Sequence, residues 1–243
     1  MYTDNIAWQY SYYIYPNLLR SLWLRKQGRV QPLPEKDAVL LYWGISLWIG
    51  GECTPANADA LLSVLEARPS PLWLYCPDDA WRALIQSRLS ERLREKTFRV
   101  YRLNHEDMPV FAEDLPCIES VTRAFMEKNL PHSDLIRDEL YSYTDMEDYY
   151  KNGLGTALVI DGGVVGYCLS EYCADDGLGV NIWIDEAFRG QGYAGKLVRA
   201  FLHQCQEKQL TAYWVCDADN FLSNKVARSG GFTLESTLQY FEL

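Results

Sequence analysis

The sequence predicts an α/β fold with a mixed (α+β) sheet, built as two successive domains, and three observations support this prediction. Apolar residues make up 48% of the chain and aromatic residues 14%, which is typical of a globular protein. Short apolar runs of strand length alternate with amphipathic stretches of helical period. The alternation starts anew near residue 97, so we expect a smaller N-terminal α/β domain at residues 1–96 and a larger domain at residues 97–243.

The N-terminal region gives clear signals for strands and helices. Its apolar runs, which are the expected strands, lie at residues 38–45, 47–49 and 72–76. Thr54 followed by Pro55 is typical of a helix start, and this helix should run to Ala67. A second helix should follow Asp79 and end near Lys96. Its expected apolar stripe is Ala80, Leu84, Ile85, Leu89 and Leu93.

The second region shows the same mixture over about 145 residues, which suits one domain. It should open with a strand at 98–103, followed by helical tracts up to about 129, after Pro131 and at 145–151. A hairpin should come next, with strands at 155–160 and 164–172 around the Gly162-Gly163 turn. The remaining elements, in order, are expected to be a strand at 179–184, a helix at 193–208, a strand at 212–216, a helix at 223–229 and a strand at 233–241.

The net charge limits the partners that the chain can have. The formal charge is −10, and binding to nucleic-acid phosphates needs a basic surface, so no nucleic-acid partner is expected. A cationic substrate such as an amine would fit an acidic field. The simpler explanation, which stays open, is that the charge only keeps the protein soluble.

Cysteine, histidine and hydropathy patterns point to a reduced cytoplasmic protein without a metal. The seven cysteines form no CxxC pair and the three histidines are scattered, so a metal site is not expected. No apolar run is long enough to cross a bilayer, so a membrane partner is not expected either. The first residues lack the basic start of a secretory signal.

The most informative segment is a glycine-rich turn between a strand and a helix. The buried strand ends with Ile182, Trp183 and Ile184, and a loop of five residues leads to Gly190. The turn continues as Gln191, Gly192, Tyr193 and Ala194 and opens an amphipathic helix. Such a turn presents backbone N–H groups at the positive end of a helix, and glycines let phosphate oxygens approach them. The segment therefore predicts a pyrophosphate site.

A dinucleotide-binding fingerprint is the competing interpretation of this turn. Gly190, Gly192 and Gly195 have its spacing, and Asp217 ends the next strand where a ribose-binding acid would lie. In that fold, however, the first glycine follows the strand almost at once, whereas five residues intervene here. The fingerprint also opens a sheet, yet only one helix and one strand follow Asp217. Both features count against an oxidoreductase.

With strand, loop, turn and helix in this order, the segment resembles the signature of the GCN5-related N-acetyltransferase (GNAT) superfamily. Arg189, Gly192 and Ala194 match its pattern of Gln or Arg, two residues, Gly, one residue, then Gly or Ala. Asn220 at a helix start and Gly231-Phe232 before the last strand resemble the end of the family's fold, so the resemblance covers about 97–243. Residues 145–155 and 214–220 resemble more narrowly the group that contains the zwittermicin A resistance acetyltransferase.

The resemblance implies a GNAT acyl-CoA N-acyltransferase fold and acetyl-CoA as co-substrate. The backbone of Ile182, Trp183 and Ile184 would lie along the pantetheine arm, with Asn220 beside it. The pyrophosphate would lie on the N–H groups from Gly190 to Gly195. The family's reaction is direct attack of an amine on the thioester in a ternary complex, which implies a small-molecule amine as the other partner. A homodimer stays an open alternative.

The residues that usually move protons in this family are missing here. The position of the family's acidic Tyr holds Ala227, and the position of its Glu holds Asn181. Glu171 is therefore a candidate base and Ser223 a candidate acid, although a strand-end carboxylate and a helix cap are the structural alternatives. The two absences also favour a second hypothesis, a protein that binds acetyl-CoA without transferring its acetyl group.

By the closer resemblance, residues 1–96 would be a reduced version of the same fold. Near its start this region carries the aromatic residues Trp8, Tyr10, Tyr12, Tyr13 and Tyr15. They could line an acceptor pocket, but packing is the simpler role, since aromatic residues dominate buried contacts.

Overall fold

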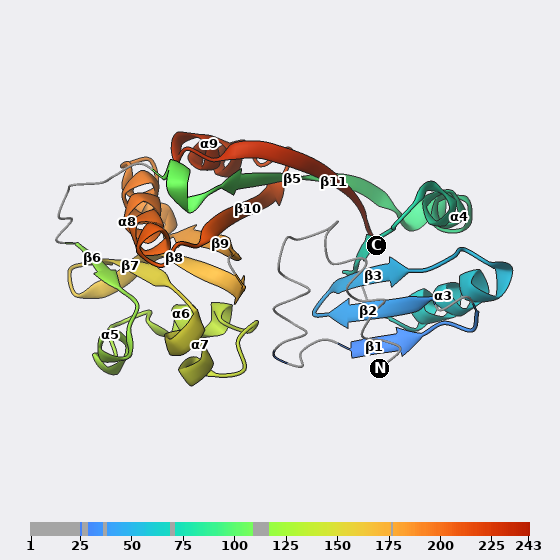
Figure 1. The fold of residues 1–243 in the computed structure, drawn as a ribbon, viewed down its shortest axis with the longest axis horizontal. Helices are drawn as coiled ribbons and strands as arrows, with labels where there is room; N and C mark the ends of the chain where they lie inside the picture. Colours follow the sequence, from blue (N-terminus) through green and yellow to red (C-terminus); the bar gives the residue numbers. More distant parts are fainter. Residues whose placement is uncertain (1–24, 26–28, 36–37, 69–70, 109–116, 176) are drawn as a thin grey trace. The chain divides into compact units, whose positions relative to one another are not determined.

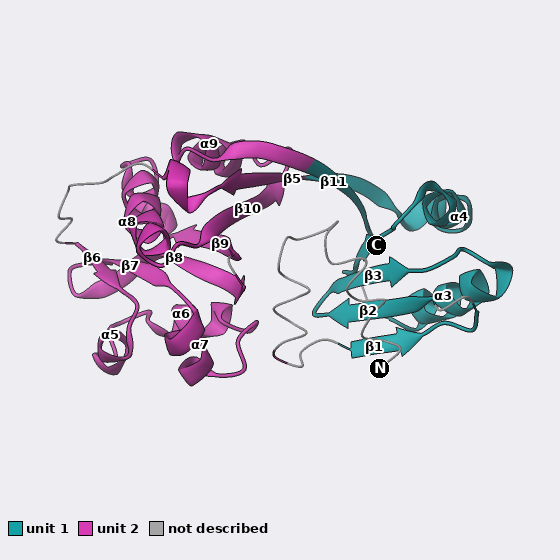
Figure 2. Cartoon of the chain, viewed as in Figure 1, with its two compact units in different colours: residues 1–15, 26–98, 237–243 teal, residues 16–25, 99–236 magenta. Residues whose placement is uncertain are grey.

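The computed structural model describes residue 25 and residues 29–35, 38–68, 71–108, 117–175 and 177–243 (Figure 1). Two compact units divide the chain (Figure 2). Of the described residues, the first unit holds those of 29–98 and 237–243, and the second holds Arg25 and those of 99–236. The aromatic residues from Trp8 to Tyr15 lie outside the described residues. The predicted domain boundary at residue 96 stays a prediction.

The first unit is a small sheet covered by helices. Its strands are β1 (Arg29–Pro32), β2 (Val39–Trp43), β3 (Ser46–Gly50) and β4 (Trp73–Tyr75), joined by the end of β11 (Thr233–Glu242). β1, β2 and β3 are antiparallel, β3 and β4 are parallel, and the end of β11 pairs antiparallel with β4. Gly44, at φ +57°, makes the turn between β2 and β3. The apolar run at 38–49 is thus strand material, as predicted.

The helices of the first unit begin where their capping residues predict. Helix α3 is Pro55–Ala67, and the Thr54 side chain accepts a hydrogen bond from the Asn57 N–H. Helix α4 is Asp79–Leu89, and the Asp78 side chain caps it in the same way.

The predicted end of α4 near Lys96 is wrong. A 3₁₀ turn, η1 (Ser90–Arg92), ends the helix, and the chain then enters strand β5 (Arg94–Leu103). Residues 94–96 are charged and have a high helix propensity, but here pairing within the sheet overrides it. The predicted stripe is partly wrong as well, because Ala80 is exposed and Trp81 is buried in its place.

The second unit is built on a larger mixed sheet, whose strand order is β11-β5-β10-β9-β8-β7-β6. Its further strands are β6 (Ile118–Ser120), β7 (Gly155–Ile160), β8 (Gly163–Ala174), β9 (Gly177–Ile184) and β10 (Thr211–Asp217). β6 to β9 are antiparallel to their neighbours, whereas β9 and β10 are parallel. The predicted hairpin is confirmed as β7 and β8. The helical tract predicted up to about residue 129 is wrong at residues 118–120, which form the short strand β6, and within its described residues only α5 (Arg123–Glu127) is α-helical.

Helices cover the two faces of this sheet (Figure 1). The helices are α5 (Arg123–Glu127), α6 (Asp134–Glu139), α7 (Met146–Asn152), α8 (Tyr193–Glu207) and α9 (Phe221–Ser229), with the 3₁₀ turns η2 (His105–Asp107) and η3 (Glu186–Phe188). Side chains of α8 such as Leu197 and Phe201 pack with Cys168 and Val180 on one face. Residues of α5, α6 and α7 pack with the alternate residues of β7 and β8 on the other face. This period of two along the strands fixes which residues share a face.

Candidate active site

Strands β9 and β10 part in the middle of the sheet. Residues 211–213 of β10 pair with residues 177–179 of β9, and no pair joins them beyond Gly179 and Tyr213. Residues 180–184 of β9 still pair with β8, and among the described residues no strand pairs with their other edge. Their other edge presents backbone N–H and C=O groups to whatever lies between the strands. The predicted residues Ile182, Trp183 and Ile184 all lie on this open edge and are half-buried.

The glycine turn follows β9 after a loop of five residues that contains η3. Gly190 and Gly192 have φ of +77° and +80°, a conformation that favours glycine. A Cβ added at either position would meet nothing within 4 Å, so the surface over the turn is open. Gly192 is the N-cap of α8 and gives it no side-chain acceptor, whereas Asp145 and Asn220 cap their own helices.

The first N–H groups of α8, from Tyr193 to Gly195, therefore keep their donor capacity at the positive end of a 15-residue helix. This arrangement suits a pyrophosphate. The residues present thus fit the coenzyme that the sequence resemblance implies: an open strand edge for an extended arm, then a helix start for its phosphates.

Two side chains predicted to belong to the site form hydrogen bonds with the backbone before the turn. The Arg189 Nε donates to the Ile184 carbonyl oxygen at 3.0 Å. The Gln191 Nε2 donates to the Ala187 carbonyl oxygen at 3.2 Å. Both bonds fold the loop back on the end of β9 and hold the glycines in place.

Asn220 and Ser223 lie at the start of α9. The Asn220 Oδ1 accepts from the Ser223 N–H at 3.1 Å and so caps the helix. The Ser223 Oγ accepts from the Trp214 indole N–H at 2.9 Å. The hydroxyl of Ser223 thus has a structural partner, and its candidacy as an acid stays a prediction. Next to Asn220, Phe221 and Leu222 are 78% and 74% exposed, so the start of α9 presents two apolar side chains on the surface.

Glu171 lies where β8 bulges against β9. Ser170 faces Val180 and Tyr172 faces Gly179, so Glu171 is the extra residue between two pairs. Burial, with a smaller contribution from the nearby carboxylate of Glu139, raises the pKa of Glu171 from 4.5 to about 7. A carboxyl group that titrates near neutral pH is suited to accept a proton from a substrate.

The sequence did not reveal the importance of Glu139, the last residue of α6. The Asn181 Nδ2 donates to the Glu139 Oε2 at 2.8 Å, and Glu139 also raises the pKa of Tyr141 and of Tyr167, in each case after burial. Asn181 stands where the sequence resemblance implies a Glu, and here it holds a carboxylate that comes from a helix. No spacing in the sequence signals this contact.

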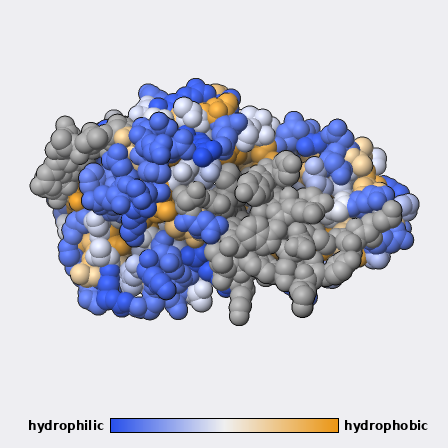
Figure 3. All heavy atoms as spheres, in the orientation of Figure 1, coloured by the Kyte–Doolittle hydropathy of each residue, from blue (hydrophilic) through white to orange (hydrophobic). Residues whose placement is uncertain are grey.

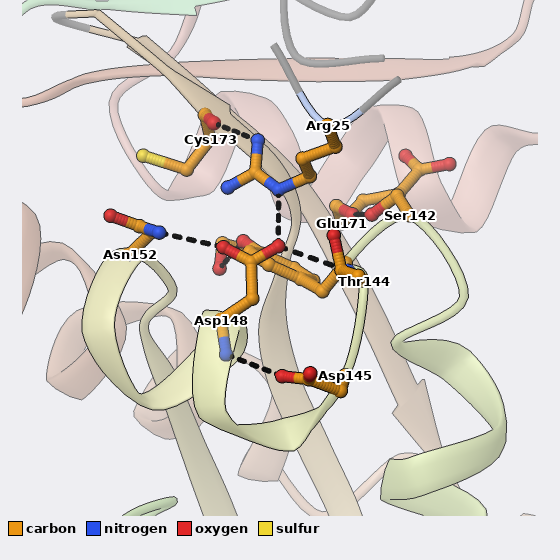
Figure 4. A network of polar contacts seen from close by, with 10 residues as sticks. Arg25, Ser142, Thr144, Asp145, Asp148, Asn152, Glu171 and Cys173 are labelled. Carbon is orange, nitrogen blue, oxygen red and sulfur yellow. Dashed lines mark hydrogen bonds and ion pairs between the residues drawn. The ribbon is translucent and has the colours of Figure 1, made fainter. Parts of the chain in front are cut away.

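A buried ion pair holds the loop next to Glu171 (Figure 4). The Arg25 Nε donates to the Asp148 Oδ2 at 2.7 Å, and the Arg25 Nη1 donates to the Cys173 carbonyl oxygen at 2.9 Å. The guanidinium also lies over the Tyr143 ring, 4.8 Å from its centroid. Arg25 and Asp148 side chains are only 8% and 16% exposed. One arginine thus joins α7 to the end of β8.

The same loop contacts the bulge of β8 through two hydroxyl groups. The Ser142 Oγ donates to the Glu171 carbonyl oxygen, as Figure 4 shows. The Tyr143 hydroxyl and the Ser170 Oγ are 2.7 Å apart. Arg25, through Tyr143, therefore belongs to the structure that positions Glu171.

We expect Arg25→Leu to lower the free energy of unfolding by about 3 kcal/mol, because it leaves the Asp148 carboxylate buried without its cation. Urea denaturation at pH 7 measures this loss. The control is Arg102→Leu, whose partner Glu235 and own side chain are 35% and 43% exposed, and which should cost about 0.5 kcal/mol. Equal losses in both variants would contradict the prediction.

The loss of unfolding free energy in Arg25→Leu should also depend on pH. Burial alone would raise the pKa of Asp148, but hydrogen bonds from Thr144, Asn152 and Arg25 outweigh it and lower the pKa below 3.8. A lowered carboxyl pKa gives stability that is present above 3.8 and is lost as the pH falls through the lowered value. The difference between the variant and the wild type should therefore shrink in acid.

On the face drawn in Figure 3, the coloured part of the surface is mainly hydrophilic, with hydrophobic atoms in small groups. Within the described ranges, no His, Cys, Asp or Glu side chains gather in a group of three or more that could hold a metal ion. The described helices include none that is long and apolar enough to cross a membrane.

Two relatives similar to this chain carry the name of acetyltransferases. The chain is 23% identical over 172 residues to the uncharacterized N-acetyltransferase YdfB of Bacillus subtilis, covering 69% of this chain and 65% of that protein. It is 35% identical over 65 residues to the ribosomal-protein-serine acetyltransferase of Escherichia coli, covering 26% of this chain and 36% of that protein. The chain thus matches less than two thirds of the length of either relative.

Solved structures share the fold. A GCN5-related N-acetyltransferase-like protein from Streptococcus suis has a TM-score of 0.65 at 21% identity, with 92% of both chains covered. A GCN5-related N-acetyltransferase from Kribbella flavida has a TM-score of 0.59 at 14% identity, covering 92% of this chain and 91% of that one.

A family model decides the assignment. The model described as GNAT acetyltransferase matches residues 31–241, which is most of the chain. The open strand edge and the glycine turn lie inside the matched range. The α/β fold with a mixed sheet that the sequence predicts is confirmed, and the chain belongs to the GNAT acetyltransferase family.

Proposed function

We propose that this chain is an acetyl-CoA-dependent N-acetyltransferase that acetylates a primary amine of a small molecule by direct attack in a ternary complex. One observation carries the proposal. β9 and β10 stop pairing after Gly179 and Tyr213, and the chain that leaves β9 leads to α8, whose first N–H groups have no side-chain acceptor at the N-cap Gly192. An extended ligand with a pyrophosphate at one end matches this site in shape and charge.

The coenzyme would lie on the turn and on the open strand edge. The residues assigned to it are Ile182, Trp183, Ile184, Arg189, Gly190, Gln191, Gly192, Tyr193, Ala194, Gly195 and Asn220. When bound, acetyl-CoA supplies the acetyl group as a thioester. Backbone N–H groups of the turn would hold the phosphates, while Arg189 and Gln191 keep the turn in shape.

Glu171 is the group that would take the proton from the acceptor ammonium. Its raised pKa of about 7 means that, near neutral pH, it is partly ionised and still basic enough to accept a proton. Ser223 is the proposed donor for the leaving thiolate. Ser223 accepts in its bond with Trp214, so that bond does not use its hydroxyl hydrogen, which can also be donated to the neighbouring Cys216 sulfur.

A second candidate function is coenzyme binding without acetyl transfer. Two observations favour it: Ala227 is fully buried at the position of the family's acidic Tyr, and Asn181 already donates to Glu139. Both functions need the same coenzyme site, so a binding measurement alone does not separate them.

A titration followed by a transfer assay tests the proposal. The purified chain should bind acetyl-CoA in a saturable manner and should not bind NAD. A panel of small amines should then release CoA thiol, which a thiol reagent detects. Binding without thiol release from any amine would favour the second candidate function. Binding of NAD but not of acetyl-CoA would remove both.

Three finer proposals complete this assignment, and the first and the third follow the same sequence resemblance. We assign the chain to the group of the zwittermicin A resistance acetyltransferase and place it in the cytoplasm. We also propose that the first unit is a reduced GNAT-like half. A tandem GNAT protein from the clavulanic acid biosynthesis pathway covers 85% of this chain with a TM-score of 0.54, which supports this idea at the level of the fold.

A further inference from the structure

Two carboxylates share the face of the sheet that α6 covers. Asn181 and Trp183 of β9 lie on this face, opposite to Val180 and Ile182, which pack with α8. Glu139 reaches Asn181 from the end of α6. Glu171 lies one strand away, near enough for the charge of Glu139 to add to burial in raising the pKa of Glu171.

Neutral donors and further negative charge surround Glu139. The Asn181 Nδ2 donates to it, and the Tyr167 hydroxyl forms a second hydrogen bond with it. Asp138 adds negative charge nearby, since it too raises the pKa of Tyr167. Among the described residues, no Lys or Arg forms an ion pair with Glu139 or Glu171. Donors of this kind favour a carboxylate but do not neutralise it.

Tyr172 gives an independent sign of a ligand. Its ring lies against Gly179, where β9 and β10 part, because a Cβ on Gly179 would come within 2.2 Å of it. The side chain is 1% exposed, and its hydroxyl has no hydrogen-bond partner in the part of the chain that the structure describes. Glu171 and Tyr213 both lie close enough to influence this hydroxyl. A buried hydroxyl without a partner is costly, so a buried water or a polar group of a ligand is its expected partner.

Aromatic rings supply apolar walls beside the carboxylates. Tyr167 stacks on Trp183 with centroids 5.5 Å apart, and Tyr141 is 55% exposed next to Glu139 and Glu171. Carboxylates combined with aromatic faces suit an alkyl chain that carries positive charge.

We propose that the acceptor is an alkyl amine with a second positive charge, which Glu139 binds while Glu171 takes the proton of the reacting ammonium. This inference rests on the N-acetyltransferase function proposed above. A single ammonium would leave one of the two carboxylates without a cation. A diamine supplies both charges: one nitrogen gives its proton to Glu171 and becomes the nucleophile, and the other stays an ammonium on Glu139.

The test compares 1,4-diaminobutane with butylamine, which differ in one amino group. In the wild type, kcat/KM should be about tenfold to hundredfold higher for the diamine, the size of one charge-assisted hydrogen bond. In Glu139→Gln, which keeps an oxygen for Asn181, this ratio should fall to near one. Asp134→Asn, at the exposed start of α6, is the matched control and should keep the wild-type ratio.

Calorimetry of the diamine with the protein alone separates this inference from the proposed function. The wild type should bind the diamine, and Glu139→Gln should bind it at least tenfold more weakly. Diamine binding that depends on Glu139, without thiol release from any amine, would keep the cation site and remove the transferase function. A wild type that acetylates butylamine as well as the diamine, or a Glu139→Gln variant that keeps the preference, would overturn the inference and leave the transferase function standing.

Discussion

Glu171→Gln is expected to lower kcat about 10²- to 10³-fold, while the affinity for acetyl-CoA stays that of the wild type. Glutamine has nearly the shape of glutamate but cannot accept a proton at neutral pH. The Ser142 bond goes to the backbone oxygen of residue 171, so it survives the substitution. Stopped-flow or steady-state thiol release gives kcat, and calorimetry gives the dissociation constant of acetyl-CoA.

The pH dependence gives the sharper readout. Glu171 must be ionised to act, so kcat/KM of the wild type should rise with pH through about 7 and level off above it. The variant should lack this rise. The acceptor should be chosen so that its own amine titrates well above pH 8, outside this window. A variant with the wild-type profile would remove Glu171 as the base.

Stability should change in the opposite direction to activity. The folded pKa of Glu171 is raised from 4.5, so the folded protein pays for ionising this group as the pH rises from 4.5 to about 7. Glutamine removes that cost, and at pH 8 the variant should be more stable by about 3 kcal/mol, since each pKa unit of the shift corresponds to about 1.4 kcal/mol. Glu66→Gln, an exposed position on α3, is the control and should change neither activity nor stability. A destabilised Glu171→Gln would instead indicate a structural carboxylate.

Local signals in the sequence were enough for most of the fold. Helix α3 follows Thr54 and Pro55, and β7 and β8 flank the turn at Gly162, because each signal acts on its immediate neighbours. The end of α4 and the strand β6 could not be predicted in this way. β6 is three residues long and is defined only by its pairing with β7, which is remote in sequence.

In the candidate site, too, local features could be predicted from the sequence, whereas contacts between remote residues could not. The glycine turn is contiguous, so its residues could be named from the sequence together with the helix that they begin. Glu139, Arg25 and Tyr172 could not, because their roles come from contacts between separate elements. Arg25 is 123 positions from Asp148, and Asn181 is 42 positions from Glu139. Nothing in their local spacing distinguishes them from ordinary surface or core residues.

Gly192→Val is expected to weaken acetyl-CoA binding at least 100-fold. The side chain would project from a residue at φ +80°, over the N–H groups that begin α8, and would keep phosphate oxygens away from them. Loss of two or three charge-assisted hydrogen bonds accounts for an effect of this size, since each contributes about 1.5 kcal/mol or more. Calorimetric titration of acetyl-CoA measures it.

Backbone strain must be separated from this effect, because valine at a positive φ also destabilises the fold. Gly162→Val is the matched control: Gly162 has φ +79°, lies in the exposed turn between β7 and β8 and, like Gly192, has nothing within 4 Å of an added Cβ. Both variants should lose a similar amount of stability in urea, of the order of 1–2 kcal/mol. Only Gly192→Val should show weaker binding of acetyl-CoA. If both folded variants bind acetyl-CoA as the wild type does, the pyrophosphate does not lie on this turn, and the proposed acetyl transfer loses its structural basis.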